Sequence, residues 1–564
     1  MFKSSVNNQG NLFSGITSHI TSRKEKMLSD PSSWHNLFYQ EVVSRIDEYI
    51  FSVLYCGDNG RPNASIRVLI GMMVLKEGNG WSDEQLFDEC RFNIKVMMAL
   101  GHMNLDEDVP SESTYYLFRR LLDDYNRLKG TDLLKQCFEK ITTDQLRSYN
   151  VSGKKIRLDS KLINSNIAVC SRVDLVLESI RKFVKHLAIG ELKEKIEQED
   201  YELLLKLKKK STTNITFGYT KADKQLLLHR MGFVIKALLS CCKHKPRYDL
   251  LKRLYEDQYT EVNKPDQNGD DNDDTGTPEL KDEKEILSTS MQSIHDPEAT
   301  FRTKGHGTKK QQISGYHANI TETCDESNEF NLIVDAQVDK AHISENDFLL
   351  DSIVTSKEVM QNAGNDHKGG EKVIEQVTTD GGYDSIENRK EMSKQDMPHW
   401  NLSKAKGVKQ SFIMYKDDDN NLQAIDKRTG VQCEISRSKK DDKVVIIIPA
   451  TEDRKIKRRY FKDEKIENYI LLQNILNGIK PEDRNLRANV ESTIHQSFHR
   501  LLKRNKVRYR GQHRCQMYVI SRVLWANFRR IQAKVGQDFA YLMIWMLSMI
   551  ITPRTTKRQN RVIY

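Results

Sequence analysis

Two segments of this chain, far apart in the sequence, each have the pattern of a short β-strand that ends in an aspartate. The first is Lys154–Asp159 (KKIRLD), and the second ends at Asp380 and is followed by two glycines. Between them, 314–323 and 330–338 alternate apolar and polar residues around a turn, which predicts a β-hairpin, and 344–360 predicts a helix. A carboxylate just past a strand end projects from the edge of a sheet, where sites commonly form. This order therefore predicts a mixed sheet with both aspartates at one edge.

A third acid, Glu491, lies inside a predicted basic helix over 486–502. Acids on neighbouring strands bind hard divalent cations through oxygen, and an acid from a helix packed across the sheet would complete a two-metal clamp for phosphodiester chemistry. The predicted elements follow the order of an RNase H-like core: a strand with Asp159, a hairpin, a helix, a strand with Asp380 and a helix with Glu491. Any one of the 79 acids is more often solvated surface, so the prediction rests on that order.

The rest of the chain predicts an α/β fold class, a mixed α+β multidomain protein. Apolar residues at helical spacing and tight turns over 34–150 predict an all-helical N-terminal DNA-binding domain at 1–150, although an ordinary helical bundle fits the same pattern. Composition and periodicity predict four further units: an RNase H-like catalytic domain over 151–170 and 300–535, a β-rich insertion in it at about 395–465, a helical insertion over 171–299 with an acidic linker at 263–285, and a C-terminal helix with a basic tail over 536–564.

Composition argues against several classes of protein. The longest apolar run, 539–552, has 14 residues, whereas a membrane span needs about 20, so we expect a buried helix there and no membrane partner. The nine cysteines include no CxxC pair, which argues against a disulfide framework or a zinc knuckle and favours a reducing cytosol. No apolar signal segment is found at the N-terminus.

The net charge of +10 becomes informative because positive charge is clustered. Residues 492–537 contain eleven Lys or Arg and no acid, and a surface of one sign beside a metal-binding acid suits a polyphosphate backbone. Paired arginines also occur in a capped helix at 111–122. The predicted DNA-binding residues are Arg119, Arg120, Arg487, His495, Arg500, Lys503, Arg504, Arg508 and Arg510.

A plainer interpretation of the same residues stays open. The arginines would then solvate a helix, and the interleaved aromatics Tyr509, Trp525 and Phe528 would be core. His495 lies four residues after Glu491, on one helix face with it, and is either a phosphate contact or an ordinary surface partner.

Segments spread over most of the chain resemble the DDE transposases of bacterial insertion sequences, in the branch with a helical N-terminal domain. They include GRPNASIRVLIGMMVLK at 60–76, PSESTYYLFRRL at 110–121, IRLDSKLINSN at 156–166, TDGGYDSIENR at 379–389 and RANVESTIHQSFHRLLKRNKVRYRG at 487–511. The resemblance implies that Asp159, Asp380 and Glu491 are the three catalytic acids and hold two Mg²⁺ or Mn²⁺ ions. Relatives often carry Tyr and Lys where this chain has Arg484 and Phe498.

The resemblance also implies a function. A transposase of this kind binds terminal inverted repeats, cleaves the DNA in a metal-dependent step and transfers the strand to a target, as a homodimer on double-stranded DNA in the bacterial cytoplasm. The N-terminal helices would read the DNA sequence, and the basic tract over 492–537 would follow the phosphate backbone of the DNA. Two alternatives stay open: a catalytically inactive, transposase-derived DNA-binding protein, and a metal nuclease of RNase H fold.

Overall fold

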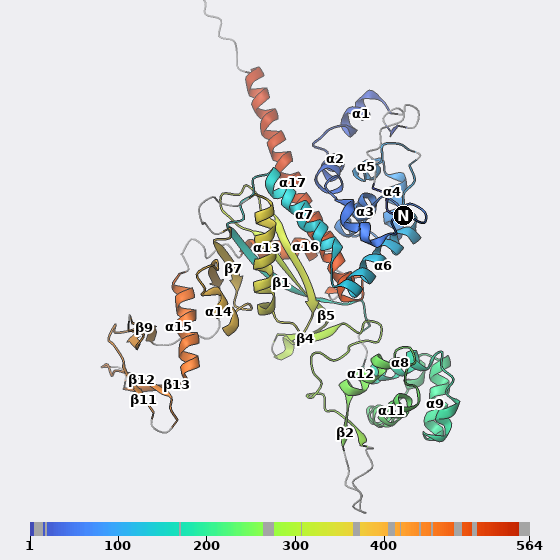
Figure 1. Cartoon of the computed structure of the whole chain (residues 1–564), viewed down its shortest axis with the longest axis vertical. Coiled ribbons are helices and arrows are strands. Elements are labelled where there is room, and N and C mark those ends of the chain that lie inside the picture. Colours follow the sequence, from blue (N-terminus) through green and yellow to red (C-terminus); the bar gives the residue numbers. More distant parts are fainter. Residues whose placement is uncertain are drawn as a thin grey trace, which may run out of the picture.

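The computed structural model describes residues 1–551 apart from 5–14, 17–19, 106, 169–170, 263–275, 306, 365–372, 404–411, 418, 439–440, 453–454, 479–487 and 499–504. Figure 1 shows a central sheet with helices on both faces, N-terminal helices beside it, and two further lobes. This confirms the predicted mixed α/β architecture with a helical N-terminal region.

The N-terminal region is helical, as the spacing of its apolar residues predicted. Its helices are α1 (Ser22–Leu28), α2 (Trp34–Phe38), a π-helical turn (Tyr39–Val43), a 3₁₀ segment (Glu48–Leu54), α3 (Ile66–Asn79), α4 (Asp83–Phe92), α5 (Ile94–Ala99), α6 (Glu112–Lys129) and α7 (Leu133–Ser148). The Ser111 hydroxyl caps α6 by accepting from the backbone N–H of Thr114. Helix α3 ends at Gly80, whose φ of 73° lies in the left-handed region that glycine adopts without strain.

The central sheet has the predicted element order. Its strands are β1 (Lys155–Asn164), β4 (Thr300–Lys304), β5 (Gln311–Thr323), β6 (Ile333–Lys340), β7 (Gln376–Asp380) and β8 (His399–Ser403). Strand β5 pairs antiparallel with β1, β4 and β6, and β1, β7 and β8 run parallel to one another. Strand, hairpin, helix and strand, with a later helix across the sheet, is the order predicted for an RNase H-like core.

Helices cover both faces of this sheet. They are α13 (Leu349–Asn362), α14 (Ile386–Met392), α15 (Asp463–Asn477), α16 (Ala488–Phe498) and α17 (Gln512–Ile551). One face packs Leu158 of β1 into a core with α13, and the other packs Ile163 into a core with α16 and α17. Alternation along β1 therefore separates two cores.

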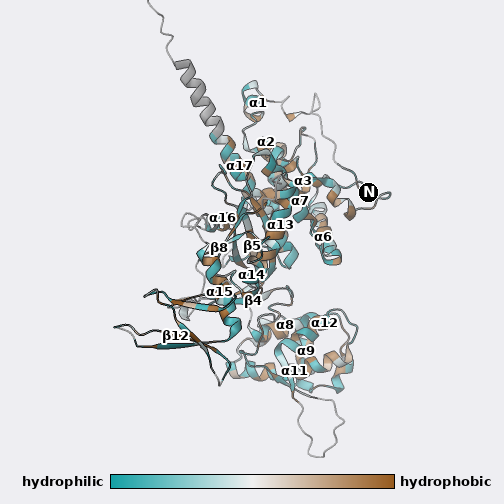
Figure 2. Cartoon of the chain, turned by 60° about the vertical axis from the view of Figure 1, so that its left-hand side comes forward, coloured by the Kyte–Doolittle hydropathy of each residue, from teal (hydrophilic) through white to brown (hydrophobic). Residues whose placement is uncertain are grey.

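The insertion between β1 and β4 is mostly helical. It contains α8 (Arg172–Val184), a 3₁₀ segment (Gly190–Glu194), α9 (Gln198–Lys209), α10 (Thr212–Thr216), α11 (Lys221–Cys241), α12 (Tyr248–Gln258), β2 (Tyr259–Val262) and β3 (Thr277–Leu280). Its apolar residues form their own buried cluster. In both views the insertion lies at the opposite end of the molecule from the N-terminal helices (Figures 1 and 2).

The extra β-structure begins later than predicted. The predicted insertion at about 395–465 includes β8, but β8 belongs to the central sheet because it pairs in parallel with β7 and buries Trp400 and Leu402 in its core. The added strands are β9 (Phe412–Lys416), β10 (Leu422–Asp426), β11 (Glu434–Arg437), β12 (Val444–Ile448) and β13 (Lys457–Phe461). They form two small sheets around a shared apolar cluster.

Helix α17, near the C-terminus, packs against the N-terminal helices. Phe38 of α2 packs against Trp525 and Phe528 of α17, with ring centroids 6.0 and 5.1 Å apart. Phe528 is core, and Trp525 is half-buried against it. The N-terminal helices therefore share a core with α17 and do not form an independent domain. The predicted boundary at 535/536 falls inside α17, which is a continuous helix there. Within the described part of the chain, no helix has the length and apolar character that a membrane crossing needs.

Candidate active site

Asp159 and Asp380 lie on β1 and β7, the two neighbouring parallel strands in the middle of the sheet. The prediction that Asp159 ends its strand was wrong, because β1 continues to Asn164 through its pairing with β5. The parallel ladder between β1 and β7 ends at the pair Arg157 and Thr378, and Asp159 and Asp380 each follow two residues later. Neighbouring strands lie about 4.8 Å apart, and residues two apart share a face, so both carboxylates lie on the face that carries Arg157. The predicted parallel adjacency of the two strands is thus confirmed.

The glycines after Asp380 form a turn that has no room for a side chain. The Gly382 N–H donates to Asp380 Oδ1 at 2.7 Å. A Cβ at residue 382 would overlap Glu345 Oε2 and come within 2.9 Å of Asp380 Oδ1. Glu345 is therefore a further carboxylate beside Asp380, and the two border the same small space.

Glu345 lies near one charged group, Lys304, and near the ring of His317. Its Oε1 lies 3.7 Å from Lys304 Nζ and 3.8 Å from His317 Nε2, and its side chain is 16% exposed. Glu345 was not among the residues predicted from the sequence. Its only local signal was the capping box from Ser344 to Asp347 at the start of a helix, which indicates a helix start and not a site.

A buried polar layer supports the aspartates. The Tyr383 hydroxyl donates to Asn319 Oδ1, and Asn319 Nδ2 donates to Ser352 Oγ at 2.9 Å. Burial, followed by the negative charges of Asp159, Glu345 and Asp380, raises the pKa of Tyr383 well above its usual value. Tyr383 therefore stays protonated and acts as a fixed donor.

His317 belongs to the same layer. Its ring nitrogens lie 2.8 Å from the Ile343 carbonyl oxygen and 2.9 Å from Ser160 Oγ, so the imidazole donates to the carbonyl and accepts from the Ser160 hydroxyl. Burial lowers the pKa of His317 to about 4. The ring is thus neutral at pH 7 and orients the residue next to Asp159.

Helix α16 lies over the face of the sheet that carries Asp159. The Thr493 hydroxyl donates to Glu322 Oε2 at 2.7 Å, and Glu322 forms a buried ion pair with Arg157 of β1 at 2.6 Å. Phe498, one turn further along α16, lies 5.7 Å from the ammonium of Lys161. Arg157 and Lys161 lie two residues before and two residues after Asp159 on the same face of β1. Helix α16 therefore covers this face on both sides of Asp159.

Glu491 and His495 lie on the exposed side of α16. Helix α16 thus lies over the predicted face of the sheet, while the approach of the Glu491 carboxylate to the aspartates stays a prediction. Arg487 lies outside the described residues. Lys161, which the sequence analysis missed, was detectable from strand alternation, since it follows Asp159 by two residues; burial lowers the pKa of its ammonium.

The donor set formed by Asp159 and Asp380 fits Mg²⁺ or Mn²⁺. Across the residues that the structure describes, no three His, Cys, Asp or Glu side chains gather closely enough to enclose a metal ion. Mg²⁺ does not need such an enclosure, because it takes one or two carboxylates and completes its octahedron with water and substrate phosphate. Asp159 and Asp380 supply two hard oxygen donors from adjacent strands.

Part of the basic tract is used inside the protein. Arg522 is 1% exposed and donates to four backbone carbonyls, two at the end of α3 and two at the end of α16. Arg530 forms an ion pair with the buried Glu322 at 2.8 Å. These residues join α17 to its neighbours, so the tract is not one continuous basic surface.

The predicted DNA-binding arginines separate into structural and exposed groups. Arg508 donates to the carbonyls of Gly80, at 2.9 Å, and Trp81, which fastens it to the end of α3. Arg510 and Arg120 are exposed. Arg500, Lys503 and Arg504 lie outside the described residues. Phosphate contact by any of them stays a prediction.

Arg119 is sandwiched between two aromatic rings. Its guanidinium lies 5.6 Å from the Tyr115 ring and 4.6 Å from the Tyr509 ring. The Tyr509 hydroxyl also contacts Glu77 of α3. Arg119 thus joins α6 to the segment before α17, and is held in place by stacking.

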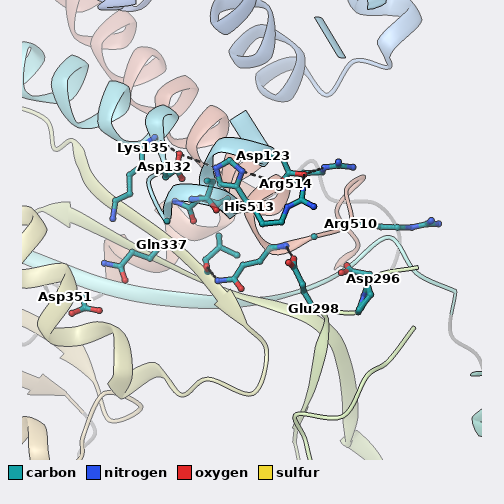
Figure 3. Close-up of a pocket in the computed structure, with 18 of the residues that line it drawn as sticks. Asp123, Asp132, Lys135, Asp296, Glu298, Gln337, Asp351, Arg510, His513 and Arg514 are labelled. Carbon is teal, nitrogen blue, oxygen red and sulfur yellow. Dashed lines mark hydrogen bonds and ion pairs between the residues drawn. The ribbon is translucent and has the colours of Figure 1, made fainter. Parts of the chain in front are cut away.

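A separate cavity of about 1360 Å³ lies where α6, α7, β6, the start of α17 and the insertion meet. Figure 3 shows His513 between Asp123 and Asp132, with Arg514 beside Asp123. Both His513 nitrogens lie 3.5 Å from a carboxylate oxygen, and Arg514 Nε lies 2.9 Å from Asp123. These ion pairs fasten the start of α17 to α6 and α7.

Comparison with known proteins identifies the N-terminal region. Residues 27–121 match the family model described as Transposase domain (DUF772). The match covers most of the helices from α1 to α6, and it supports the predicted resemblance to transposases of insertion sequences. No curated protein matches the chain.

Proposed function

We propose that this chain is a DDE-type transposase that binds the ends of its element, cleaves DNA in a metal-dependent step and joins the ends to a target. The observation that carries the proposal is the position of Asp159 and Asp380 on the adjacent parallel strands β1 and β7. The transposase domain at 27–121 favours this function over a metal nuclease that cuts without joining. The retained acids argue against an inactive DNA-binding derivative.

In the proposed site, Asp159 and Asp380 hold two Mg²⁺ or Mn²⁺ ions, with Glu491 as the third acid. When bound, the metal lowers the pKa of the attacking water or 3′-hydroxyl and neutralises charge on the phosphate. The Gly382 N–H orients the Asp380 carboxylate, and the protonated Tyr383 fixes the layer beneath it. Exposed arginines hold the DNA, and a homodimer brings the two ends together.

The test replaces each acid by its amide. Asp159→Asn and Asp380→Asn should lower metal-dependent cleavage of end DNA by at least about 1000-fold, since metal catalysis supplies several kcal/mol and about 1.4 kcal/mol corresponds to a factor of ten. Binding of end DNA should stay within about threefold, because the arginines are unchanged.

Glu375→Gln is the matched control, because Glu375 immediately precedes β7 but forms a half-exposed surface pair with Lys154 at 2.8 Å. It should cleave like the wild type. Metal-dependent cleavage retained by either aspartate variant would remove that residue from the site. Cleavage without strand joining by the wild type would favour the nuclease.

A further inference from the structure

The two groups of arginines that the sequence places 390 residues apart line one groove. A cavity of about 740 Å³ lies between α6 and the segment that leads into α17. It is lined by no acidic residue and by five arginines: Arg119, Arg120, Arg508, Arg510 and Arg514. Asn166, just beyond the end of β1, also borders it.

Two of these arginines build the walls of the groove. Arg508 is bound to the carbonyls at the end of α3, and Arg119 is stacked between Tyr115 and Tyr509. Their charges remain, but their positions are fixed by contacts within the protein. The groove is thus held open by packing that does not involve a ligand.

The other three arginines have guanidinium N–H groups that could donate to a ligand. Arg120 is exposed and makes no hydrogen bond or ion pair with the residues that the structure describes. Arg510 is exposed and donates through Nε to the Asn166 carbonyl at 2.7 Å, and Arg514 is 46% exposed and uses Nε for Asp123. Guanidinium groups arranged on two facing walls suit a phosphate backbone, which accepts paired N–H donors.

The distance along β1 between Asp159 and the groove can be converted into a number of nucleotides. Five residues of β1 separate Asp159 from Asn164, which is about 16 Å at about 3.3 Å per strand residue. Phosphates of one DNA strand follow one another at about 3.4 Å along the axis, so this corresponds to about five nucleotides. Lys161 lies on the Asp159 face between the two places.

We propose that α6 and residues 508–514 form one composite groove for the phosphate backbone of duplex DNA, about five nucleotides from the phosphodiester held at Asp159 and Asp380. This rests on the proposed function. The N-terminal domain and the basic tract then act as a single binding site, whereas the sequence predicted two sites with separate tasks.

The test is a double-mutant cycle on binding. Arg120→Ala and Arg510→Ala should each weaken duplex binding and flatten the slope of log affinity against log salt by about 0.9. Because both contact one stretch of backbone, the double variant should lose at least about threefold less affinity than the product of the two single losses. Arg508→Ala is avoided, since it would strip two carbonyls of their partner.

Arg437→Ala is the control, because Arg437 is exposed but already paired with Asp463 at 3.0 Å. It should leave the slope unchanged. Losses that multiply, or an unchanged slope in the Arg120 or Arg510 variant, would overturn the composite groove.

Substituted DNA locates the contact. One neutral methylphosphonate placed four to six nucleotides from the cut should weaken wild-type binding and add nothing to the loss of the double variant. An equal effect at every position would contradict the proposed location. Binding is read without cleavage, so absence of cleavage by the wild type would overturn the proposed function and leave this result standing.

Discussion

Replacing Gly382 by Ala tests whether the second aspartate is positioned by the turn that follows it. The new Cβ would overlap Glu345 Oε2 and approach Asp380 Oδ1 to 2.9 Å. Ordinary van der Waals separation is about 3.5 Å, so Glu345 has to retreat by more than about 1 Å, and the Asp380 carboxylate has to shift with the turn.

The cost should appear in activity more than in stability. The Glu345 carboxylate is at the end of a flexible side chain and pairs with Lys304 at 3.7 Å near the surface. Displacing this carboxylate should therefore lower the free energy of unfolding by about 1 kcal/mol. A displacement of about 1 Å at a catalytic group can lower the rate by about 100-fold. We therefore expect Gly382→Ala to cleave DNA about 10 to 100 times more slowly, with its melting temperature nearly unchanged.

A second-site change isolates the cause. Glu345→Ala truncates the side chain that collides with the new methyl group. Adding Gly382→Ala to Glu345→Ala should then slow cleavage by less than about threefold, whereas the same change in the wild type should have the full effect. Cleavage would be measured under single-turnover conditions. Wild-type cleavage by Gly382→Ala, or equal losses in both backgrounds, would refute the close approach of Glu345 to this turn.

Two further predictions concern α17. Arg522→Met removes the donors of four backbone carbonyls, at about 1 kcal/mol or more each, and should lower the free energy of unfolding by at least about 4 kcal/mol. In the same urea denaturation, Arg529→Ala should lower it by less than about 0.5 kcal/mol, because Arg529 is exposed. A small loss for Arg522→Met would contradict its structural role. Burial opposes the charged form of His513, but Asp123 and Asp132 outweigh it and raise the pKa of His513 to about 9, above the roughly 6.5 of an unfolded chain. This stabilisation, about 3 kcal/mol, should be complete below about pH 6.5 and lost as pH rises through about 9, and His513→Gln should abolish it; equal pH dependence of both proteins would contradict the ion pairs.

Much of the central sheet could be predicted because its signals are local. Alternation predicted the β5–β6 hairpin, and the runs that end at Asp159 and Asp380 predicted β1 and β7, although β1 continues to Asn164. Helix capping at Ser111 fixed the start of α6. The parallel neighbourhood of the two aspartates followed from the order of the elements, which sequence carries directly.

Contacts between distant segments could not be predicted in the same way. Glu345 reaches Asp380 only because the turn at Gly382 has no side chain, and no spacing in the sequence records that approach. Arg522 looked like a surface arginine, although it is buried among carbonyls from α3 and α16. Phe528 is core and Trp525 packs against it because α17 contacts α2, which is almost 500 residues away in the sequence.

The central claim is that Asp159 and Asp380 hold the same metal site, and exchange of the ligand type tests it most directly. Cysteine binds Mg²⁺ poorly because thiolate is a soft ligand, whereas Mn²⁺ tolerates it better. Cleavage of end DNA by Asp159→Cys and Asp380→Cys would be measured in Mg²⁺ and in Mn²⁺. If the two aspartates share a metal site, we expect a loss of at least about 100-fold in Mg²⁺ and substantial recovery in Mn²⁺ for both variants. Cleavage that survives in Mg²⁺, or that is lost equally in both metals, would contradict it.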